Sequence, residues 1–297
     1  MSDVYVYGMT VLSTIHLLRQ FYPAANTYGE IERSYAMPGG EGANCAVVLR
    51  NLGVSVALDA CLLGDETREP LLNYLEPRGI DCSRLQYRPG FAGWRDLVLC
   101  DGQSRTVFGW FGQYLFGTET LWTQPDEDAI RAAQCVALDP FFRDGSAQVA
   151  AWCVEHDTPY VTIDCHWDQP MAHNARALVC SQEFLAREYP DEAPEALMDR
   201  YRTACRGLVI FTFGSQPLWY ASHTTPLATL APFPVEVVDT LAAGDTFRAG
   251  IVYGLLRGMD EAAVVQFASA TAAVACTRFP SVYEPPTLAE IEALLAG

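Results

Sequence analysis

Short apolar segments alternate with helix-forming segments along most of the chain, and this alternation restricts the possible folds more than any other feature of the sequence. A strand–helix–strand order places helices on both faces of a mainly parallel sheet. We therefore predict an α/β fold with a doubly wound, mainly parallel sheet flanked by helices. Strands are predicted at 4–7, 54–64, 135–139, 159–165, 177–180, 207–214 and 217–222; helices are predicted at 42–53, 66–79, 126–133, 146–156, 244–257, 260–276 and from Thr287 onward.

Two segments depart from this alternation. Residues 10–37 are mixed in character and rich in aromatic side chains, and two β-prone runs within residues 91–112 flank Asp101-Gly102, which is a strong hairpin signal. We expect these segments, about 10–37 and 91–112, to form a small β lid that projects from the sheet. No internal repeat, low-complexity stretch or linker divides the chain, so a single domain is predicted over residues 1–297.

The charge balance argues against several classes of partner. The formal net charge is −17, which disfavours nucleic acid and anionic membrane surfaces. It does not exclude a phosphate-bearing ligand, because backbone N–H groups and a divalent metal can offset charge locally. No apolar run approaches the ~18 residues that a membrane span needs. We expect a small-molecule partner, with no nucleic acid and no membrane.

The cysteines and the N-terminus indicate the compartment. None of the ten cysteines forms a C-x-x-C pair, and most lie within apolar runs, so buried free thiols are expected rather than a zinc site or disulfides. The first residues, MSDVYVYG, lack the basic and apolar regions of a signal peptide. A cytoplasmic location is predicted.

Several common catalytic motifs are absent from the sequence. It contains no G-x-x-x-x-G-K-[ST] and no G-x-S-x-G, and Gly8 after the first strand does not begin a G-x-G-x-x-G. A P-loop enzyme and an α/β-hydrolase are therefore disfavoured, and so is an NAD-linked dehydrogenase. The five histidines do not form a metal-binding pair.

The first of two glycine-rich turns that lead into helices reads PGGEGANCA, residues 38–46. Gly39 and Gly40 would let the backbone approach a ligand closely. Asn44 offers both a donor and an acceptor, which suits a hydroxylated molecule. Taken alone, this stretch could equally be a flexible turn before a helix.

The second turn reads VVDTLAAGDTFRAG, residues 237–250. Ala242, Ala243 and Gly244 would leave backbone N–H groups uncovered at a helix N-terminus, where they could bind a phosphate. Asp245 is placed to accept a proton from an attacking hydroxyl, and the helix N-terminus should keep its carboxylate ionised. The alternative is that Asp245 only caps the helix.

Together the two turns resemble the two signatures of the PfkB family of carbohydrate kinases, which have the ribokinase-like fold. The second turn is similar to the family pattern D-T-x-[GA]-A-G-D. The resemblance runs from about residue 3 to residue 295, and LLGDE (62–66), FTFGS (211–215) and the ending PPTLAEIEALL are similar to further family blocks.

This resemblance implies ATP-dependent phosphorylation of a primary hydroxyl, usually on a sugar or a nucleoside. It implies that Asp245 is the catalytic base and that the N–H groups of Ala242, Ala243 and Gly244 form the anion hole. Gly39, Gly40 and Asn44 would touch the substrate. The lid would cover the sugar and could form a homodimer contact.

The resemblance also implies a nucleotide site and two cations. The positions expected to bind ATP are Thr212, Gly214, Ser215, Thr240 and Ser269. Glu183 matches the glutamate of an N-x-x-E motif that organises Mg²⁺ indirectly. Asp239 falls where some members place a monovalent cation such as K⁺.

Several residues depart from the family pattern. Ser13 stands where many members carry an aspartate that grips sugar hydroxyls, so the substrate contact there is expected to change. Cys180 replaces the asparagine of the N-x-x-E motif. Ser269 stands where family members frequently have an asparagine, and Pro217 where they frequently have a glycine. These departures keep two alternatives open: a nucleoside kinase, and a ribokinase-like ligand sensor with weakened activity.

Asp164 lies in IDCHWD, residues 163–168, at the predicted end of a strand. Because ligands of open α/β sheets bind at the carboxyl ends of the strands, Asp164 could contact the substrate or a metal-bound water. The alternative is a turn residue.

Overall fold

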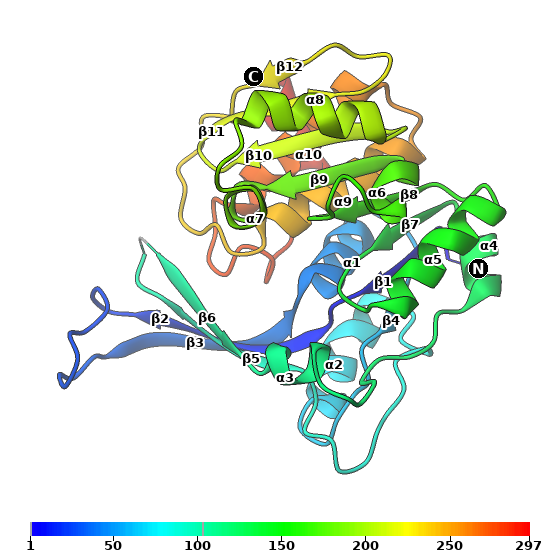
Figure 1. Cartoon of the computed structure of the whole chain (residues 1–297). Helices are drawn as coiled ribbons and strands as arrows, with labels where there is room; N and C mark the ends of the chain where they lie inside the picture. Colours follow the sequence, from blue (N-terminus) through cyan, green and yellow to red (C-terminus); the bar gives the residue numbers. More distant parts are fainter. Residues whose placement is uncertain (1, 103) are drawn as a thin grey trace.

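The structure, a computed structural model, describes residues 2–102 and 104–297. The larger of its two sheets has the strand order β12-β11-β10-β9-β8-β7-β1-β4 (Figure 1). Six neighbouring strands, β10, β9, β8, β7, β1 and β4, run parallel, and β11 and β12 are paired antiparallel at one edge. The bounds are β1 (Val4–Gly8), β4 (Val56–Ala60), β7 (Cys135–Leu138), β8 (Tyr160–Ile163), β9 (Ala177–Ser181), β10 (Leu208–Phe213), β11 (Gln216–Ala221) and β12 (Ala228–Leu230).

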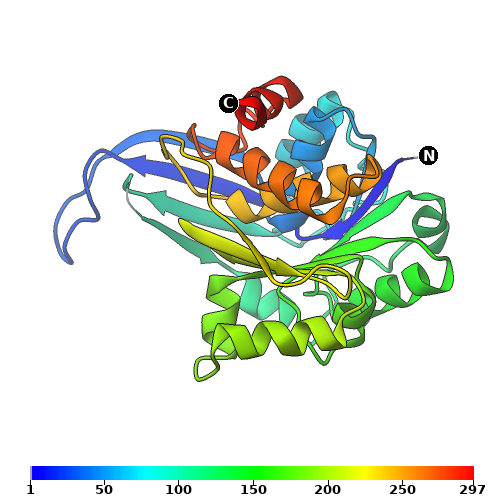
Figure 2. The same ribbon diagram turned by 90° about the horizontal axis from the view of Figure 1, so that it is seen from above.

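Helices cover both faces of this sheet, as a doubly wound fold requires (Figure 2). The alternating side chains of β1 show the two faces: Val4 and Val6 pack into one apolar core, and Tyr5 and Tyr7 into the other. One core is built with α1 (Glu41–Asn51), α2 (Arg68–Leu75), α9 (Ala243–Leu256), α10 (Glu261–Ala275) and α11 (Leu288–Ala296). The other uses α4 (Glu127–Ala132), α5 (Asp144–Glu155), α6 (Pro170–Asn174), α7 (Gln182–Glu188) and α8 (Pro194–Ala204).

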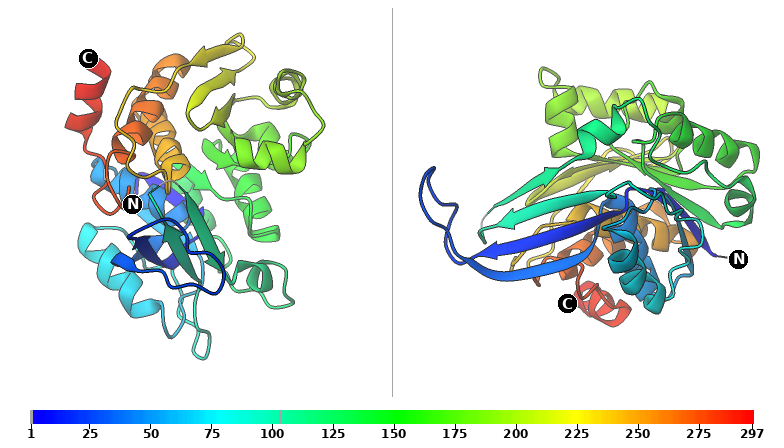
Figure 3. Two further views of the ribbon diagram at one scale, coloured as in Figure 1. Left: turned by 90° about the vertical axis from the view of Figure 1, so that its left-hand side faces the viewer. Right: turned by 90° about the horizontal axis from the view of Figure 1, so that it is seen from below.

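A second, four-stranded sheet projects from one side of the larger one (Figures 1 and 3). We call it the lid sheet; its strands are β2 (Val11–Leu18), β3 (Ile31–Gly39), β5 (Arg95–Cys100) and β6 (Arg105–Gly109), in the order β3-β2-β5-β6. β5 and β6 form the predicted hairpin, whose turn includes residue 103, outside the described residues. The short helix α3 (Phe111–Leu115) follows β6. The lid segments predicted from the sequence are thus paired with each other.

The structure corrects some element boundaries. The predicted strand 54–64 is too long, because β4 ends at Ala60, whose φ of 99° is incompatible with continued extended backbone. The segment 10–37 contains two long strands that the sequence did not reveal, since apolar residues occur on both faces of β2. The single-domain organisation stays a prediction. No helix among residues 2–102 and 104–297 is long and apolar enough to cross a bilayer.

A close approach between β1 and α1 fixes where α1 begins. A Cβ atom added at Gly42 would lie 2.6 Å from the carbonyl carbon of Gly8, and one added at Gly8 would lie 2.7 Å from the Cα of Gly42. Only glycine fits at either position without a backbone shift. The first turn of α1 therefore lies directly against the carboxyl end of β1.

We expect Gly42→Ala to destabilise the protein by about 1–3 kcal/mol, because the added methyl group must push α1 away from β1. The matched control is Gly112→Ala, another helical glycine, where an added Cβ meets no atom within 4 Å. Urea unfolding measures both free energies. Equal stability of the two variants would contradict the close packing described here.

Candidate active site

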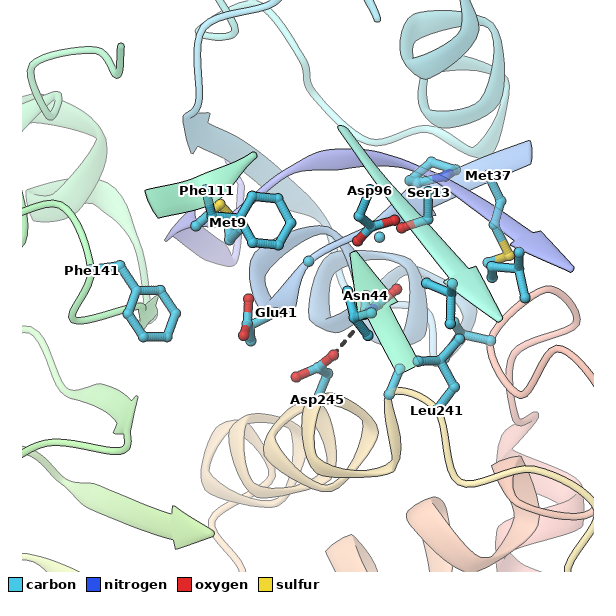
Figure 4. A pocket seen from close by; sticks show the side chains of 18 of the residues that line it. Met9, Ser13, Met37, Glu41, Asn44, Asp96, Phe111, Phe141, Leu241 and Asp245 are labelled. Atoms are coloured by element: carbon cyan, nitrogen blue, oxygen red, sulfur yellow. Dashed lines mark hydrogen bonds between the residues drawn. The ribbon is translucent and has the colours of Figure 1, made fainter. Parts of the chain in front are cut away.

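A cavity of about 310 Å³ lies between the lid sheet, the carboxyl end of β1 and the first turns of α1 and α9 (Figure 4). Apolar side chains from the lid sheet and from segments that follow β1, β6 and β7 form most of its wall, and polar groups lie among them at a few positions. The polar side chains are Ser13, Glu41, Asn44, Asp96 and Asp245; the apolar ones include Met9, Ile15, Met37, Val98, Phe111, Phe141, Leu241 and Val282. A small hydroxylated molecule could be enclosed here.

The two glycine-rich turns meet at this cavity. The side-chain amide of Asn44, in the first turns of α1, donates a hydrogen bond of 2.8 Å to Oδ2 of Asp245, in the first turn of α9 (Figure 4). The two residues are 201 positions apart in the sequence. Gly39, Gly40 and Ala242 also line the cavity. The structure thus brings together most of the predicted substrate and catalytic positions.

The N-terminus of α9 offers uncovered backbone donors. Ala242 adopts the left-handed conformation (φ 60°) and directs the chain into the helix. The N–H of Ala243 donates to the carbonyl of Thr240 at 3.3 Å. The N–H groups of Gly244 and Asp245 lie in the first turn, where no intrahelical carbonyl precedes them, and Gly244 is exposed. Gly244 and Asp245 are therefore better placed than Ala243 to bind an anion.

A buried ion pair joins the elements around the cavity. The guanidinium of Arg248, in α9, contacts the carboxylate of Asp139, and both side chains are fully buried. Arg248 also donates to the carbonyl of Glu41 at 2.6 Å, and Asp139 accepts from the backbone N–H of Met9 at 2.6 Å. This network links α9, the start of α1 and the carboxyl ends of β1 and β7. The sequence did not point to it, because a lone arginine in a helix usually faces solvent.

The pKa of Asp245 is raised, contrary to the expectation for a helix N-terminus. Burial is the main cause, and the charges of Asp139 and Asp164 add to it, while Arg248 and the Asn44 hydrogen bond oppose it. Burial and the nearby Asp245 charge also raise the pKa of Glu41. The desolvation of these carboxylates outweighs the favourable helix dipole.

Ser13 lies on the lid side of the cavity, paired in register with Asp96 of β5. A Cβ atom on Gly39 would collide with the Ser13 hydroxyl, so glycine is required there. Asp96 is only 8% exposed, and burial raises its pKa to about 6, with the Ser13 hydroxyl acting in the opposite direction. Sequence reasoning missed Asp96, because within β5 it reads as one polar residue of an ordinary strand.

Two predicted site residues lie outside the cavity wall. Asp164 accepts hydrogen bonds from the backbone N–H (2.8 Å) and hydroxyl (3.1 Å) of Ser181, and its φ of 42° is typical of a turn. Asp164 therefore has a structural role in this turn, and its predicted contact with a substrate stays a prediction. Asp239 accepts from the N–H groups of Leu241 (2.9 Å) and Ser281 (3.1 Å), so both of its oxygens organise the turn before α9.

The predicted nucleotide positions also lie outside the cavity wall. Thr212 is in the last part of β10, and Gly214 and Ser215 are exposed in the turn that follows. Thr240 is exposed, and its hydroxyl accepts from the lid residue Arg105 at 2.8 Å. Ser269 is buried within α10.

The described residues contain no group of three or more His, Cys, Asp or Glu side chains that could hold a metal ion. Glu183 is exposed in the first turn of α7. All ten cysteines are free and buried, as predicted.

We expect Arg248→Met to lower the free energy of unfolding by about 3–5 kcal/mol, because it leaves the Asp139 carboxylate buried without its counterion. Adding Asp139→Asn to that variant should recover much of the loss, since asparagine is neutral and can still accept from the Met9 N–H. Urea unfolding of the four proteins in the cycle measures both effects. A double variant as unstable as the sum of the single variants would contradict the pairing.

Comparisons with known proteins identify related sequences and structures. The family model for pfkB family carbohydrate kinases matches residues 1–287. The chain is 26% identical over 277 residues to a ribokinase of Bacillus subtilis, covering 88% of each chain. It is 27% identical over 280 residues to a nucleoside kinase of Methanothermobacter thermautotrophicus, covering 91% of this chain and 88% of the relative.

A solved structure shows the same fold. The structure of Arabidopsis thaliana ribokinase complexed with ribose and ATP superposes with a TM-score of 0.83 at 17% identity, covering 100% of this chain and 99% of the other. At this identity the likeness concerns the fold alone. The family match extends over nearly the whole sequence and includes both glycine-rich turns. The chain therefore belongs to the pfkB family of carbohydrate kinases.

Proposed function

We propose that this chain transfers the γ-phosphoryl group of ATP to a primary hydroxyl of a sugar-like small molecule. The observation that carries the proposal is the position of Asp245: a carboxylate in the first turn of a helix, oriented by Asn44 and facing a cavity under the lid sheet. Phosphoryl transfer needs a group that orients the attacking hydroxyl next to a site that binds phosphate, and α9 offers both within one turn.

Asp245 acts as the base in this proposal. The Asn44 amide donates to Oδ2, which leaves Oδ1 available for the acceptor hydroxyl. A raised pKa brings a carboxylate closer to the operating pH and makes it a better proton acceptor while it is still ionised near neutrality. The positive charge of Arg248 limits the rise of this pKa, and its ion pair with Asp139 holds α9 in place.

The phosphates of ATP would lie at the N-terminus of α9. The uncovered N–H groups of Gly244 and Asp245, with the positive end of the helix, fit a phosphate that carries developing charge. Ala242 and Ala243 shape this turn. The nucleotide would extend along the carboxyl edge of the sheet, where we propose contacts with the five positions expected from the sequence, Thr212, Gly214, Ser215, Thr240 and Ser269.

Mg²⁺ fits this arrangement as a partner of the phosphates. The ion usually keeps several waters and takes one or two carboxylates in addition to substrate phosphates, so no three-ligand protein cluster is needed. We propose that Glu183 holds it through water. A K⁺ ion at Asp239 fits less well, because both carboxylate oxygens already accept backbone N–H groups.

The lid sheet would close over the acceptor and exclude water. Ser13, Gly39 and Gly40 lie on the acceptor side of the cavity. The outer face of the lid carries exposed aromatic side chains, among them Phe108 (52% exposed) and Trp110 (44%), which is compatible with a homodimer contact. That contact stays a prediction.

Two rival functions make different predictions in one assay. A ligand sensor would bind an acceptor without releasing ADP. A nucleoside kinase would release ADP with nucleosides and not with free sugars; the similarity to a nucleoside kinase keeps this alternative open. A screen of sugars, amino sugars, sugar acids and nucleosides for ADP release, with Mg²⁺ and K⁺ present, separates the three.

We expect Asp245→Asn to bind ATP normally and to lose about 10²–10⁴-fold in turnover, because the amide cannot accept the hydroxyl proton. The matched control is Asp128→Asn, which removes an exposed carboxylate from the first turn of α4 and should leave turnover unchanged. ADP release and nucleotide binding are measured for each. Normal ADP release by Asp245→Asn would exclude this residue as the base.

The pH dependence reports the environment of Asp245. Because the base must be ionised, kcat/KM should fall as the pH drops through its folded-state pKa, which lies above the ordinary value near 3.8. Asn44→Ala removes a hydrogen bond that favours the ionised form, so the acid limb of the profile should move to higher pH. The midpoint of that limb is compared in the two proteins. An unchanged midpoint, or one at lower pH, would contradict the Asn44–Asp245 contact.

A further inference from the structure

Asp96 is a carboxylate of the cavity wall that the proposed reaction does not use. It projects from β5 of the lid sheet, next to Ser13, and Figure 4 shows both side chains directed into the cavity on the side away from Asp245. The side chain is 8% exposed. Within the described residues, its Oδ1 is buried and has no hydrogen-bond partner.

A buried carboxylate oxygen without a partner is costly, and folded proteins rarely keep one without a role. Burial raises the pKa of the Asp96 carboxyl group, and the hydroxyl of Ser13, its register neighbour on β2, acts in the opposite direction. The other residues of β2 and β5 that line the cavity are apolar, Ile15 and Val98. The missing donor must therefore come from a molecule that occupies the cavity.

The charges around the cavity restrict that molecule further. Three carboxyl groups line it, Glu41, Asp96 and Asp245, and no Arg or His is among the described residues of the wall. The chain has no lysine. The buried arginine below the cavity, Arg248, is already bonded to Asp139 and to the Glu41 carbonyl. A negatively charged group on the bound molecule would be repelled by these carboxylates and would find no counterion in the wall.

We propose that Asp96 anchors the phosphate acceptor and determines its class: a molecule that offers hydrogen-bond donors to Asp96, either hydroxyls or an ammonium group, and carries no carboxylate, phosphate or sulfonate. This inference rests on the proposed kinase activity. The acceptor is held between the lid and α9, with one end on Asp96 and Ser13 and its primary hydroxyl at Asp245. The residue that carries out the transfer, Asp245, is thus on α9, and the residue that selects the acceptor, Asp96, is on β5 of the lid sheet.

The test uses three groups of acceptors that all have a free primary hydroxyl: neutral polyols (ribose, fructose, ribitol), amines (glucosamine, 1-amino-1-deoxyfructose) and anions (gluconate, glucose 1-phosphate). ADP release gives kcat and KM for the wild type and for Asp96→Asn. The matched control is Glu32→Gln, which removes an exposed carboxylate from β3 of the same lid sheet, away from the cavity.

The wild type should phosphorylate a neutral or amine acceptor and reject the anions. For the best acceptor, Asp96→Asn should raise KM about 10-fold or more with a smaller change in kcat, since a charge-assisted hydrogen bond is replaced by a neutral one. A larger effect on amines than on polyols would identify an ammonium partner. Preference for an anionic acceptor, or an unchanged KM in Asp96→Asn, would overturn the proposal.

Thermal unfolding separates binding from folding and from catalysis. Without ligand, Asp96→Asn should be at least as stable as the wild type at pH 8, because an unpaired buried charge is removed. If the variant is less stable and its KM is unchanged, Asp96 is a structural residue and the proposal is overturned. If the wild type releases no ADP with any acceptor, the kinase proposal fails. Asp96 is then judged by the stabilisation that an added acceptor gives against thermal unfolding. Polyols or amines should stabilise the wild type and should not stabilise Asp96→Asn. A wild type that no acceptor stabilises, or an Asp96→Asn variant that is still stabilised, would overturn the assignment.

Discussion

The arrangement of the site depends on one buried ion pair, Arg248 with Asp139. Burying two charges is expensive, and such a pair is tolerated only when further hydrogen bonds satisfy its remaining atoms. Here the Met9 N–H and the Glu41 carbonyl supply two of them. Because these groups belong to β1, β7, α1 and α9, the pair fixes the first turn of α1 against that of α9. The close contact of Gly8 with Gly42 fixes the same helix from the other side.

This framework explains why the acceptor cavity is both acidic and apolar. The arginine that balances the charge is bonded to Asp139 and to the Glu41 carbonyl and does not line the cavity, so its positive charge limits the pKa of Asp245 from outside the wall. In the proposed function, the positive end of the α9 dipole attracts the phosphate. The lid sheet supplies the remaining polar contacts, Ser13 and Asp96. In the proposed function, the lid would determine the acceptor, while the N-terminus of α9 would bind the phosphate and supply the base.

Much of the fold could be predicted from local patterns. Alternating strands and helices indicate the doubly wound sheet, and Asp101-Gly102 indicates the lid hairpin. The meeting of Asn44 and Asp245 followed from the rule that motifs at the carboxyl ends of parallel strands share one edge. Other residues could not be recognised in this way. The position of Asp96 depends on the parallel pairing of β2 with β5, which is 83 residues away (Ser13 to Asp96). Asp164 stands at the expected edge, but its carboxylate is used by Ser181, and no sequence pattern shows that hydrogen bond.

The most direct test of the account is a crystal structure of the Asp245→Asn variant with a non-hydrolysable ATP analogue, Mg²⁺ and the best acceptor of the screen. The account predicts the primary hydroxyl of the acceptor next to residue 245, other donors of the acceptor on Asp96, and the terminal phosphate at the N–H groups of Gly244 and residue 245. An acceptor bound outside this cavity, or a terminal phosphate directed away from the N-terminus of α9, would contradict it.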